Sequence, residues 1–389
     1  MNLLEKGYAI PPLSPVAMKL VELAADDNCS ASDLANLIEK DPSLSVRLLK
    51  LANSAFFRTL YPVTTLNQAV VKVGFHRLRI MALSVSLRDT FPMGKVSSLD
   101  YEEFWRFSIY RALIARYLAR ELKTCSSEEA FVAALIMEIG LLVFFDLFIK
   151  ESPEKIEIRL NPLKDLLAWE EKKYGVNHRQ IGEGALRYWK FPDHMVLCQQ
   201  ASGNALPSKD CDPLVKICEL SRILSRMISS NSEEFSAPYE LAEKYFGLDQ
   251  TVINDILLTT FEQVEDIAGS LRVELNKEED ILRIVEKANM TLSRMSDLIS
   301  ESQNEPGPDS LPAFNSLGNR KDSTVKTLQA VAHEIRNPLT VIGGFARRLV
   351  ASTDLDSAGS KYAHIILEEA ARLEEFLSKV TSQTETEQE

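Results

Sequence analysis

The sequence predicts an all-α protein, and three observations support this fold class. Apolar residues recur at three- and four-residue intervals along almost the whole chain, as they do on one face of a helix. Runs of β-branched residues bounded by turn residues, which would indicate strands, are scarce. Helix-start signals are frequent: Ser30 and Asp33 form a capping-box pattern, and Asp41 precedes Pro42 as an N-cap precedes a proline in the first turn. We therefore expect a multi-helix domain, then a helical linker and an antiparallel two-helix hairpin.

The charge of the chain argues against a nucleic-acid partner. The 389 residues carry a formal net charge of −12, which repels phosphate backbones and anionic lipid. Basic stretches such as 72–79 are short. The length and the hydrophobic share of 45% are those of a globular chain with two or more domains.

Two features favour a cytoplasmic protein without a membrane segment. The most apolar stretch, residues 130–148, contains Glu138 and Asp146, and acidic residues are costly inside a bilayer. We therefore expect a helix over residues 131–145 that is buried in a soluble core. The five cysteines are scattered and form no CxxC pair, which indicates free thiols in a reducing compartment.

The pattern of the chain changes several times along its length. We expect a large helical domain over residues 1–275 and a polar, disordered tail over 383–389. Between them we expect a signalling helix or short coiled coil over 276–301, a flexible linker rich in Pro, Gly and Ser over 302–323, and a helical hairpin over 324–382. The coiled-coil interpretation rests on a heptad-like apolar seam, which would also suit a surface helix that packs on the first domain.

The hairpin carries apolar stripes that two helices cannot bury alone. Apolar residues alternate at intervals of four and three over 328–349, and again over 363–380 after a polar turn. Two such hairpins can cover each other's stripes in a dimeric four-helix bundle. We therefore expect a homodimer.

His333 lies one position beyond the apolar seam, so it should point outward from the stripe. Glu334 can orient the imidazole and accept its proton while the other ring nitrogen attacks a phosphoryl group. Asn337 lies one turn further on the same face and could position a water for hydrolysis of a phosphorylated histidine. Pro338 should bend the helix just beyond the site. These residues predict a phosphoacceptor histidine.

The stretch His333-Glu334-Ile335-Arg336-Asn337-Pro338-Leu339 resembles the H-box of sensor histidine kinases, and residues 325–380 resemble their dimerisation and phosphoacceptor hairpin. The resemblance implies phosphate exchange with a response regulator or a separate histidine kinase. No ATP-binding domain follows the hairpin in this sequence. Two alternatives therefore stay open: a dimeric scaffold without phosphotransfer, or the N-terminal part of a full sensor histidine kinase.

The N-terminal two thirds resemble the HDOD family. The residues that carry the resemblance are concentrated in residues 8–87, among them Asp41-Pro42-Ser43-Leu44, Leu51-Ala52-Asn53-Ser54 and Leu66-Asn67-Gln68-Ala69-Val70. HDOD domains are similar to HD-type metal phosphohydrolases, whose metals need His and Asp ligands from several helices.

The positions that should hold a metal are degenerate here. The "HD" pair reads Met137-Glu138, and His178 stands at another ligand position. Gln199 and Gln200 stand where a histidine pair is often found. Since a catalytic metal needs about three protein ligands, we expect no metal, no cofactor and a structural role for His178. Tyr188 and Trp189 are expected in the core.

The sequence thus predicts a bacterial signal-transduction protein. A non-catalytic HDOD domain would sense or bind a partner and control a phosphoacceptor hairpin in a two-component pathway or phosphorelay. Whether the chain has an enzymatic activity stays open, since neither a complete metal site nor a nucleotide site is evident. A metal phosphohydrolase is the least favoured reading.

Overall fold

The computed structural model describes residues 10–24, 30–53, 62–96, 99–150, 163–200, 206, 208, 210–228 and 236–275. Beyond residue 275 it describes only Gly343 and Ala371, which are both helical. His333, Glu334, Asn337 and the predicted coiled coil, linker, hairpin and tail therefore lie outside the described residues. The predicted fold class can therefore be compared with the structure only for the N-terminal part of the chain.

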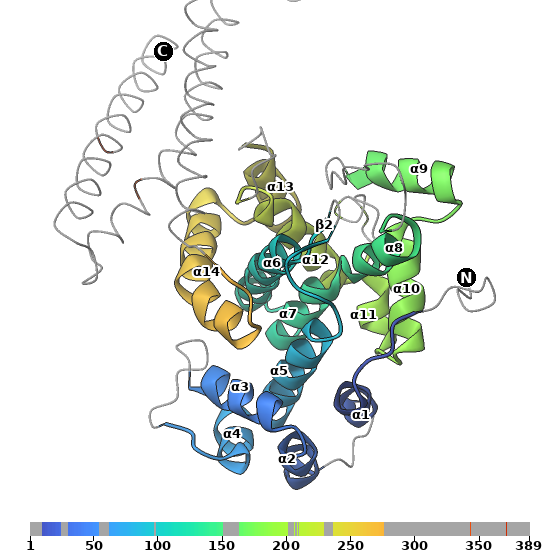
Figure 1. Cartoon of the computed structure of the whole chain (residues 1–389). Helices are drawn as coiled ribbons and strands as arrows, with labels where there is room; N and C mark the ends of the chain where they lie inside the picture. The colour runs from blue at the N-terminus through green and yellow to red at the C-terminus, as the bar shows by residue number, and fades with distance from the viewer. Residues whose placement is uncertain are drawn as a thin grey trace, which may run out of the picture. The chain divides into compact units, whose positions relative to one another are not determined.

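Met1–Arg226 and Thr259–Asn276 form one compact unit that is almost entirely helical. Figure 1 labels its elements. In chain order they are α1 Pro15–Ala24, α2 Ala31–Glu39, α3 Pro42–Ala52, α4 Leu66–Val73, α5 Phe75–Arg88, β1 Lys95–Val96, β2 Leu99–Asp100, α6 Tyr101–Leu122, α7 Ser127–Ile136, α8 Ile139–Phe148, α9 Leu163–Tyr174, α10 His178–Tyr188, α11 Asp193–Leu197, α12 Pro213–Ser225 and the second half of α14 Gln250–Ser270.

The N-terminal helices begin where the sequence signals place them. The Ser30 side chain accepts from the Asp33 backbone N–H, and the Asp33 carboxylate accepts from the Ser30 N–H, so the predicted capping box is formed. Asp41 caps α3 through the Leu44 N–H, with Pro42 in the first turn. Helices α2, α3 and α4 pack on one another, and α5 packs against α1, α3 and α4 before it reaches α7.

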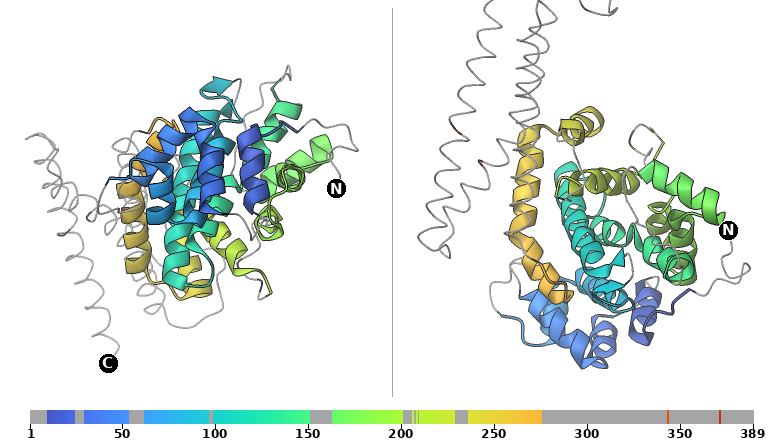
Figure 2. Two further views of the ribbon diagram at one scale, coloured as in Figure 1. Left: turned by 90° about the horizontal axis from the view of Figure 1, so that it is seen from below. Right: turned by 45° about the horizontal axis from the view of Figure 1, so that its top comes forward.

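The core of the unit is built around α6, which packs against α7 and α12 (Figures 1 and 2). Large aromatic side chains of α6 are fully buried, among them Trp105 and Tyr110. Tyr110 packs on Phe261 of α14, with ring centroids 5.1 Å apart. Burial of side chains of this size contributes about 1.5–3 kcal/mol each, so these contacts fix where the other helices lie.

The apolar stretch predicted as one buried helix is interrupted. Helix α7 ends at Ile136 and α8 begins at Ile139, with Met137 and Glu138 in a turn between them. Among the described residues, the segment Ser127–Phe148 is long and apolar enough to cross a membrane. However, 83% of its most apolar window is buried inside the protein, as in many core helices. The turn lets the buried Glu138 carboxylate reach polar partners that a continuous apolar helix would not offer.

Two smaller features differ from the prediction. A short antiparallel pair, β1 with β2, precedes α6, with Lys95 opposite Asp100. Trp189 is buried as predicted and its Nε1 donates to the Pro11 carbonyl at 3.0 Å. The prediction for Tyr188 was wrong, because its side chain is 44% exposed. The two residues follow each other at the end of α10, so they point in different directions.

Helices α8 and α10 approach each other closely at two glycines. A Cβ atom on Gly140 would lie 1.9 Å from the His178 carbonyl oxygen and 2.5 Å from the Gly182 nitrogen. A Cβ atom on Gly182 would lie 2.3 Å from Gln199 Oε1. Only glycine lets the two backbones come this close, and the approach places α10 directly over the α7–α8 turn.

Met227–Leu258, together with the chain from Lys277 onward, forms a second unit. Its described part contains α13, Ser236–Phe246, and the first half of α14. The buried Tyr239 hydroxyl lies 2.7 Å from Asn254 Oδ1 and donates to it, which ties α13 to α14.

Alanine at position 140 should disrupt the α8–α10 contact. We expect Gly140→Ala to lower the free energy of unfolding by about 3 kcal/mol or more, because no flexible side chain can yield to the new methyl group. Gly269→Ala is the matched control, since a Cβ there meets nothing within 4 Å. It should stabilise α14 by about 0.5–1 kcal/mol. Urea denaturation of the two variants measures both changes, and equal stabilities would contradict the close approach.

Candidate functional site

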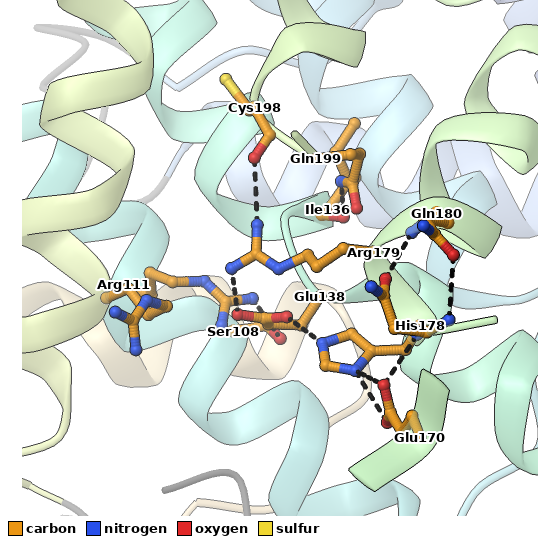
Figure 3. A network of polar contacts seen from close by, with 12 residues as sticks. Ser108, Arg111, Ile136, Glu138, Glu170, His178, Arg179, Gln180, Cys198 and Gln199 are labelled. Atoms are coloured by element: carbon orange, nitrogen blue, oxygen red, sulfur yellow. Dashed lines mark hydrogen bonds and ion pairs between the residues drawn. The ribbon is translucent and has the colours of Figure 1, made fainter. Parts of the chain in front are cut away.

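The polar centre of the domain lies at the α7–α8 turn, where Glu138 is only 3% exposed. Its Oε2 lies 3.0 Å from His178 Nε2, and its Oε1 accepts a hydrogen bond of 2.7 Å from Arg179 Nη2. Figure 3 shows the carboxylate between the two cationic side chains. Both oxygens of this buried acid are therefore engaged by α10.

His178 is fully buried and bridges two carboxylates. Its Nδ1 lies 2.9 and 2.8 Å from the two carboxylate oxygens of Glu170, on α9. The backbone N–H of His178 also donates to Glu170 Oε2 at 2.8 Å. Carboxylates only accept hydrogen bonds, so an imidazole with a carboxylate at each nitrogen is best served by the doubly protonated form. His178 thus behaves as a buried cation.

Arg179 connects this centre to α11. Besides Glu138, its guanidinium donates from Nη1 to the Cys198 carbonyl at 3.0 Å. Arg111 approaches from α6, where Nε donates to the Ala134 carbonyl at 2.7 Å and Nη2 donates to Ser108 Oγ at 3.1 Å. We call Glu138, Glu170, His178 and Arg179 the ion cluster; its formal charges cancel.

The two glutamines have different surroundings. Gln199 is buried, and its Nε2 donates to the Ile136 carbonyl at 3.0 Å, which closes the turn before Met137. Gln200 is exposed and its Nε2 donates to Glu183 Oε1 at 3.2 Å. The structure therefore brings Met137, Glu138, His178 and Gln199 together and leaves Gln200 outside the centre.

The ionisation of the cluster follows from its geometry. Burial alone would raise the pKa of Glu138, but the Arg179 charge, the hydrogen bond and charge of His178, and Arg111 outweigh it and hold the pKa well below its usual range. Burial opposes protonation of His178, but Glu138 and Glu170 outweigh it and raise the pKa of the imidazole. Burial lowers the pKa of Arg111 to about 10, although Glu138 favours its charged form. The surroundings therefore favour the carboxylate form of Glu138 and the doubly protonated form of His178.

The residues at these positions do not fit a metal ion. A protonated imidazole has no lone pair to offer, and both Glu138 oxygens already accept from cations. A divalent ion at this point would also face the positive charges of His178 and Arg179. Among the described residues no group of three or more His, Cys, Asp or Glu side chains is arranged to hold a metal. The chemistry of the cluster is that of a fixed internal salt bridge.

Sequence reasoning identified Glu138 and His178 but missed Glu170 and Arg179. A signal for Glu170 existed, because it lies at helical spacing from the buried Leu163, Leu166 and Leu167 of α9, and an acid in such a stripe needs a buried partner. No comparable signal marks Arg179. His194 lies nearby in the short helix α11.

The fold and this centre define a helical domain in which side-chain cations stand beside a buried acid. The family model of the HDOD domain matches residues 10–204, just over half of the 389-residue chain, and the chain belongs to the HDOD family. The model of the His Kinase A (phospho-acceptor) domain matches residues 325–387. The predicted fusion and its order are confirmed, and the combination is that of a signalling protein.

Several known proteins are similar to this chain. The uncharacterized protein YuxH of Bacillus subtilis (strain 168) is 31% identical over 128 residues, which cover 33% of this chain and 29% of that protein, so the match spans less than a third of the relative. A provisionally named phosphohydrolase from Shewanella amazonensis SB2B has a TM-score of 0.55 and 21% identity, over 69% of this chain and 98% of that one. An HDOD domain protein of unknown function from Geobacter sulfurreducens has a TM-score of 0.51 and 17% identity, over 70% and 97%. At these identities the structures show the fold alone.

Removal of the Arg179 charge should be strongly destabilising. In Arg179→Met, Glu138 loses its closest cation while it stays buried, so we expect the free energy of unfolding to fall by about 3–5 kcal/mol. Arg187→Met on the same helix is the control, because Arg187 is half exposed and pairs with Glu183 and Asp193 at the surface. It should cost no more than about 1 kcal/mol. Similar losses in both variants, measured by urea denaturation, would contradict an energetically important cluster.

Stability should depend on pH in a manner set by the cluster. Because folding raises the pKa of His178, its contribution is complete below the ordinary value of 6.5 and is lost as pH rises through the folded pKa. Glu138 has the opposite sign: its contribution is present above the ordinary value of 4.5 and is lost as pH falls toward the lowered pKa. The cluster therefore stabilises most between about pH 4.5 and 6.5.

Urea denaturation from about pH 4 to pH 9 tests this dependence. His178→Gln should be less stable than the unmodified protein and should lose the decline above pH 6.5. His194→Gln, a partly exposed histidine of α11, should keep the wild-type profile. An unchanged profile in His178→Gln would refute the assignment of a buried imidazolium.

Proposed function

We propose that this chain is a bacterial signal-transduction protein in which a non-catalytic HDOD domain controls a phosphoacceptor hairpin. The proposal rests on a contrast between the two domains: the residues of one site neutralise each other, whereas the other keeps the residues that phosphotransfer needs. The HDOD centre is an internally neutralised ion cluster, whereas the H-box keeps His333, Glu334 and Asn337 within the matched segment 325–387. The part that retains reactive chemistry is therefore the hairpin.

The proposed chemistry takes place at His333. One imidazole nitrogen attacks the phosphorus of an aspartyl phosphate on a response regulator, or of a phosphoryl group offered by a histidine kinase. The bond from phosphorus to the donor atom breaks, which is P–O for an aspartyl phosphate and P–N for a phosphohistidine, and the electron pair stays with the donor. Glu334 accepts the proton from the other ring nitrogen. Asn337 orients the water that later hydrolyses the phosphohistidine. A homodimer in the cytoplasm, with each hairpin completing a four-helix bundle, is part of the proposal.

A metal phosphohydrolase is the second candidate, because a similar solved structure from Shewanella amazonensis SB2B is provisionally described as a metal-dependent phosphohydrolase. The ion cluster argues against it, since His178 and Glu138 are committed to each other and to Arg179. Elemental analysis of the purified chain should show no stoichiometric transition metal, and His178→Ala should alter no phosphatase activity.

A dimeric scaffold is the third candidate, and it predicts that His333→Gln keeps signalling while Ile335→Asp, on the apolar seam, abolishes it.

Phosphotransfer can be tested with the full chain. Receiver proteins loaded with acetyl phosphate are mixed with it, and acid-labile phosphate on the chain is followed by phosphate-affinity gels and mass spectrometry. We expect phosphate on His333, none in His333→Gln, and a rate lower by about 100-fold in Glu334→Gln, since a general base contributes about 10²–10⁴.

Asn337→Ala should accept phosphate and lose it more slowly. His364→Gln, a histidine of the same hairpin outside the H-box, is the matched control and should behave as the unmodified chain. A chain that carries phosphate equally well with and without His333 would rule out this function.

A further inference from the structure

Helix α14 ends in a left-handed turn just before the chain leaves the HDOD domain. Arg272 follows the helix with φ of 53°, a left-handed conformation that normally favours glycine. The Val273 N–H reaches back to the Ala268 carbonyl at 2.9 Å, and Leu271 and Val273 are buried. A residue with a side chain persists in this conformation only where its surroundings fix it.

The surroundings that fix residues 271–275 come from three different helices. Arg88, at the end of α5, donates from Nη2 to the Arg272 carbonyl at 3.3 Å. Arg272 Nη2 donates to Ser43 Oγ, in the first turn of α3, at 2.9 Å. The Glu274 N–H donates to Glu102 Oε1, in the first turn of α6, at 3.1 Å. Figures 1 and 2 show the orange end of α14 beside the blue helices α3 and α5.

Together with one ion pair, these contacts link α3, α5 and Arg272 in a closed ring. Asp89, next to Arg88, accepts from both terminal nitrogens of Arg47 on α3, one of them at 3.0 Å. Helix α3 is thus tied to α5, α5 to the carbonyl of Arg272, and the side chain of Arg272 back to α3. A shift of α3 relative to α5 must therefore move residues 271–275 or break one of the three links. Arg88 and Arg47 are buried, whereas Arg272, Glu274 and Ser43 are exposed.

The strength of the links suits a joint that opens without unfolding the domain. The hydrogen bonds of Arg272 and Glu274 lie at the surface, where water competes for the same groups. Local opening at such places costs less than global unfolding. The aromatic core under α6 would remain closed.

We propose that residues 271–275 are an exit joint through which the HDOD domain controls the segment 276–301 and, beyond it, the phosphoacceptor hairpin. A partner that binds the N-terminal helices and displaces α3 against α5 would release Arg272 and Glu274. Only the consequence for phosphate at His333 rests on the function proposed above. The joint itself follows from the contacts.

Two neighbouring glutamates allow a matched test in the full chain. Glu102→Ala removes the acceptor of the Glu274 N–H. Glu103→Ala removes an equivalent carboxylate from the same first turn, and among the described residues this carboxylate pairs with Arg106 alone, at 3.7 Å. Hydrogen–deuterium exchange with mass spectrometry is read in peptides that cover 271–275 and 276–301. We expect Glu102→Ala to speed exchange about tenfold in both peptides, and Glu103→Ala in neither.

Ser43→Ala, an exposed and mild change, removes the Arg272 link and should act in the same direction. Faster exchange in 271–275 without any change in 276–301 would overturn the inference, and so would equal behaviour of the two glutamate variants. An unmodified chain in which 276–301 exchanges as fast as an unstructured peptide would also overturn it, because such a segment cannot transmit a shift.

The rate of phosphate transfer to His333 separates the inference from the proposed function. If the unmodified chain takes up phosphate, Glu102→Ala should change the rate at least threefold relative to Glu103→Ala, and an unchanged rate refutes control by the joint. If no phosphate reaches His333 at all, the proposed function fails, and the exchange pattern alone then decides whether the joint exists.

Discussion

The bridge that His178 forms between Glu138 and Glu170 is the constraint on which the rest of the HDOD centre depends. Two buried carboxylates, on α9 and in the α7–α8 turn, share one imidazolium, and Arg179 supplies the second positive charge. Buried charges are tolerated only when each is paired and hydrogen-bonded, so all three elements must keep their positions together. The close approach at Gly140 and Gly182 and the break at Met137 and Glu138 are the backbone features that make this geometry possible.

The same constraint explains what the domain can do. The cations beside Glu138 are the side chains of His178 and Arg179, which α10 holds in place. The formal charges of the cluster cancel, and both Glu138 oxygens and both ring nitrogens of His178 are paired within it. The cluster thereby holds α9, α10 and the α7–α8 turn in one arrangement.

The ion cluster and residues 271–275 differ in how firmly they are held. Around the ion cluster the links are buried charge pairs, and around residues 271–275 they are a few hydrogen bonds at the surface and one residue in a strained conformation. A domain of this kind keeps its core while its exit segment can change state at a modest cost in free energy.

Much of the fold was predictable from the sequence because the deciding interactions are local. The capping box at Ser30 and the N-cap Asp41 involve groups within three residues of each other, and both were confirmed. The absence of histidine at the "HD" pair and at Gln199 could also be read directly from the sequence. The turn at Met137 and Glu138 was missed because it follows from the distant Arg179 and His178, and a run of apolar residues by itself favours a continuous helix.

By itself the sequence determined the two families, their order, and the identity of the acid and the histidine at the degenerate site. Only the tertiary structure decided that Glu170 and Arg179 complete an ion cluster, and that Arg88, Ser43 and Glu102 hold the end of α14. The physical reason is that periodicity and capping depend on neighbours in the chain, whereas these contacts join residues from 8 to 229 positions apart, and the local pattern does not identify which residues pair.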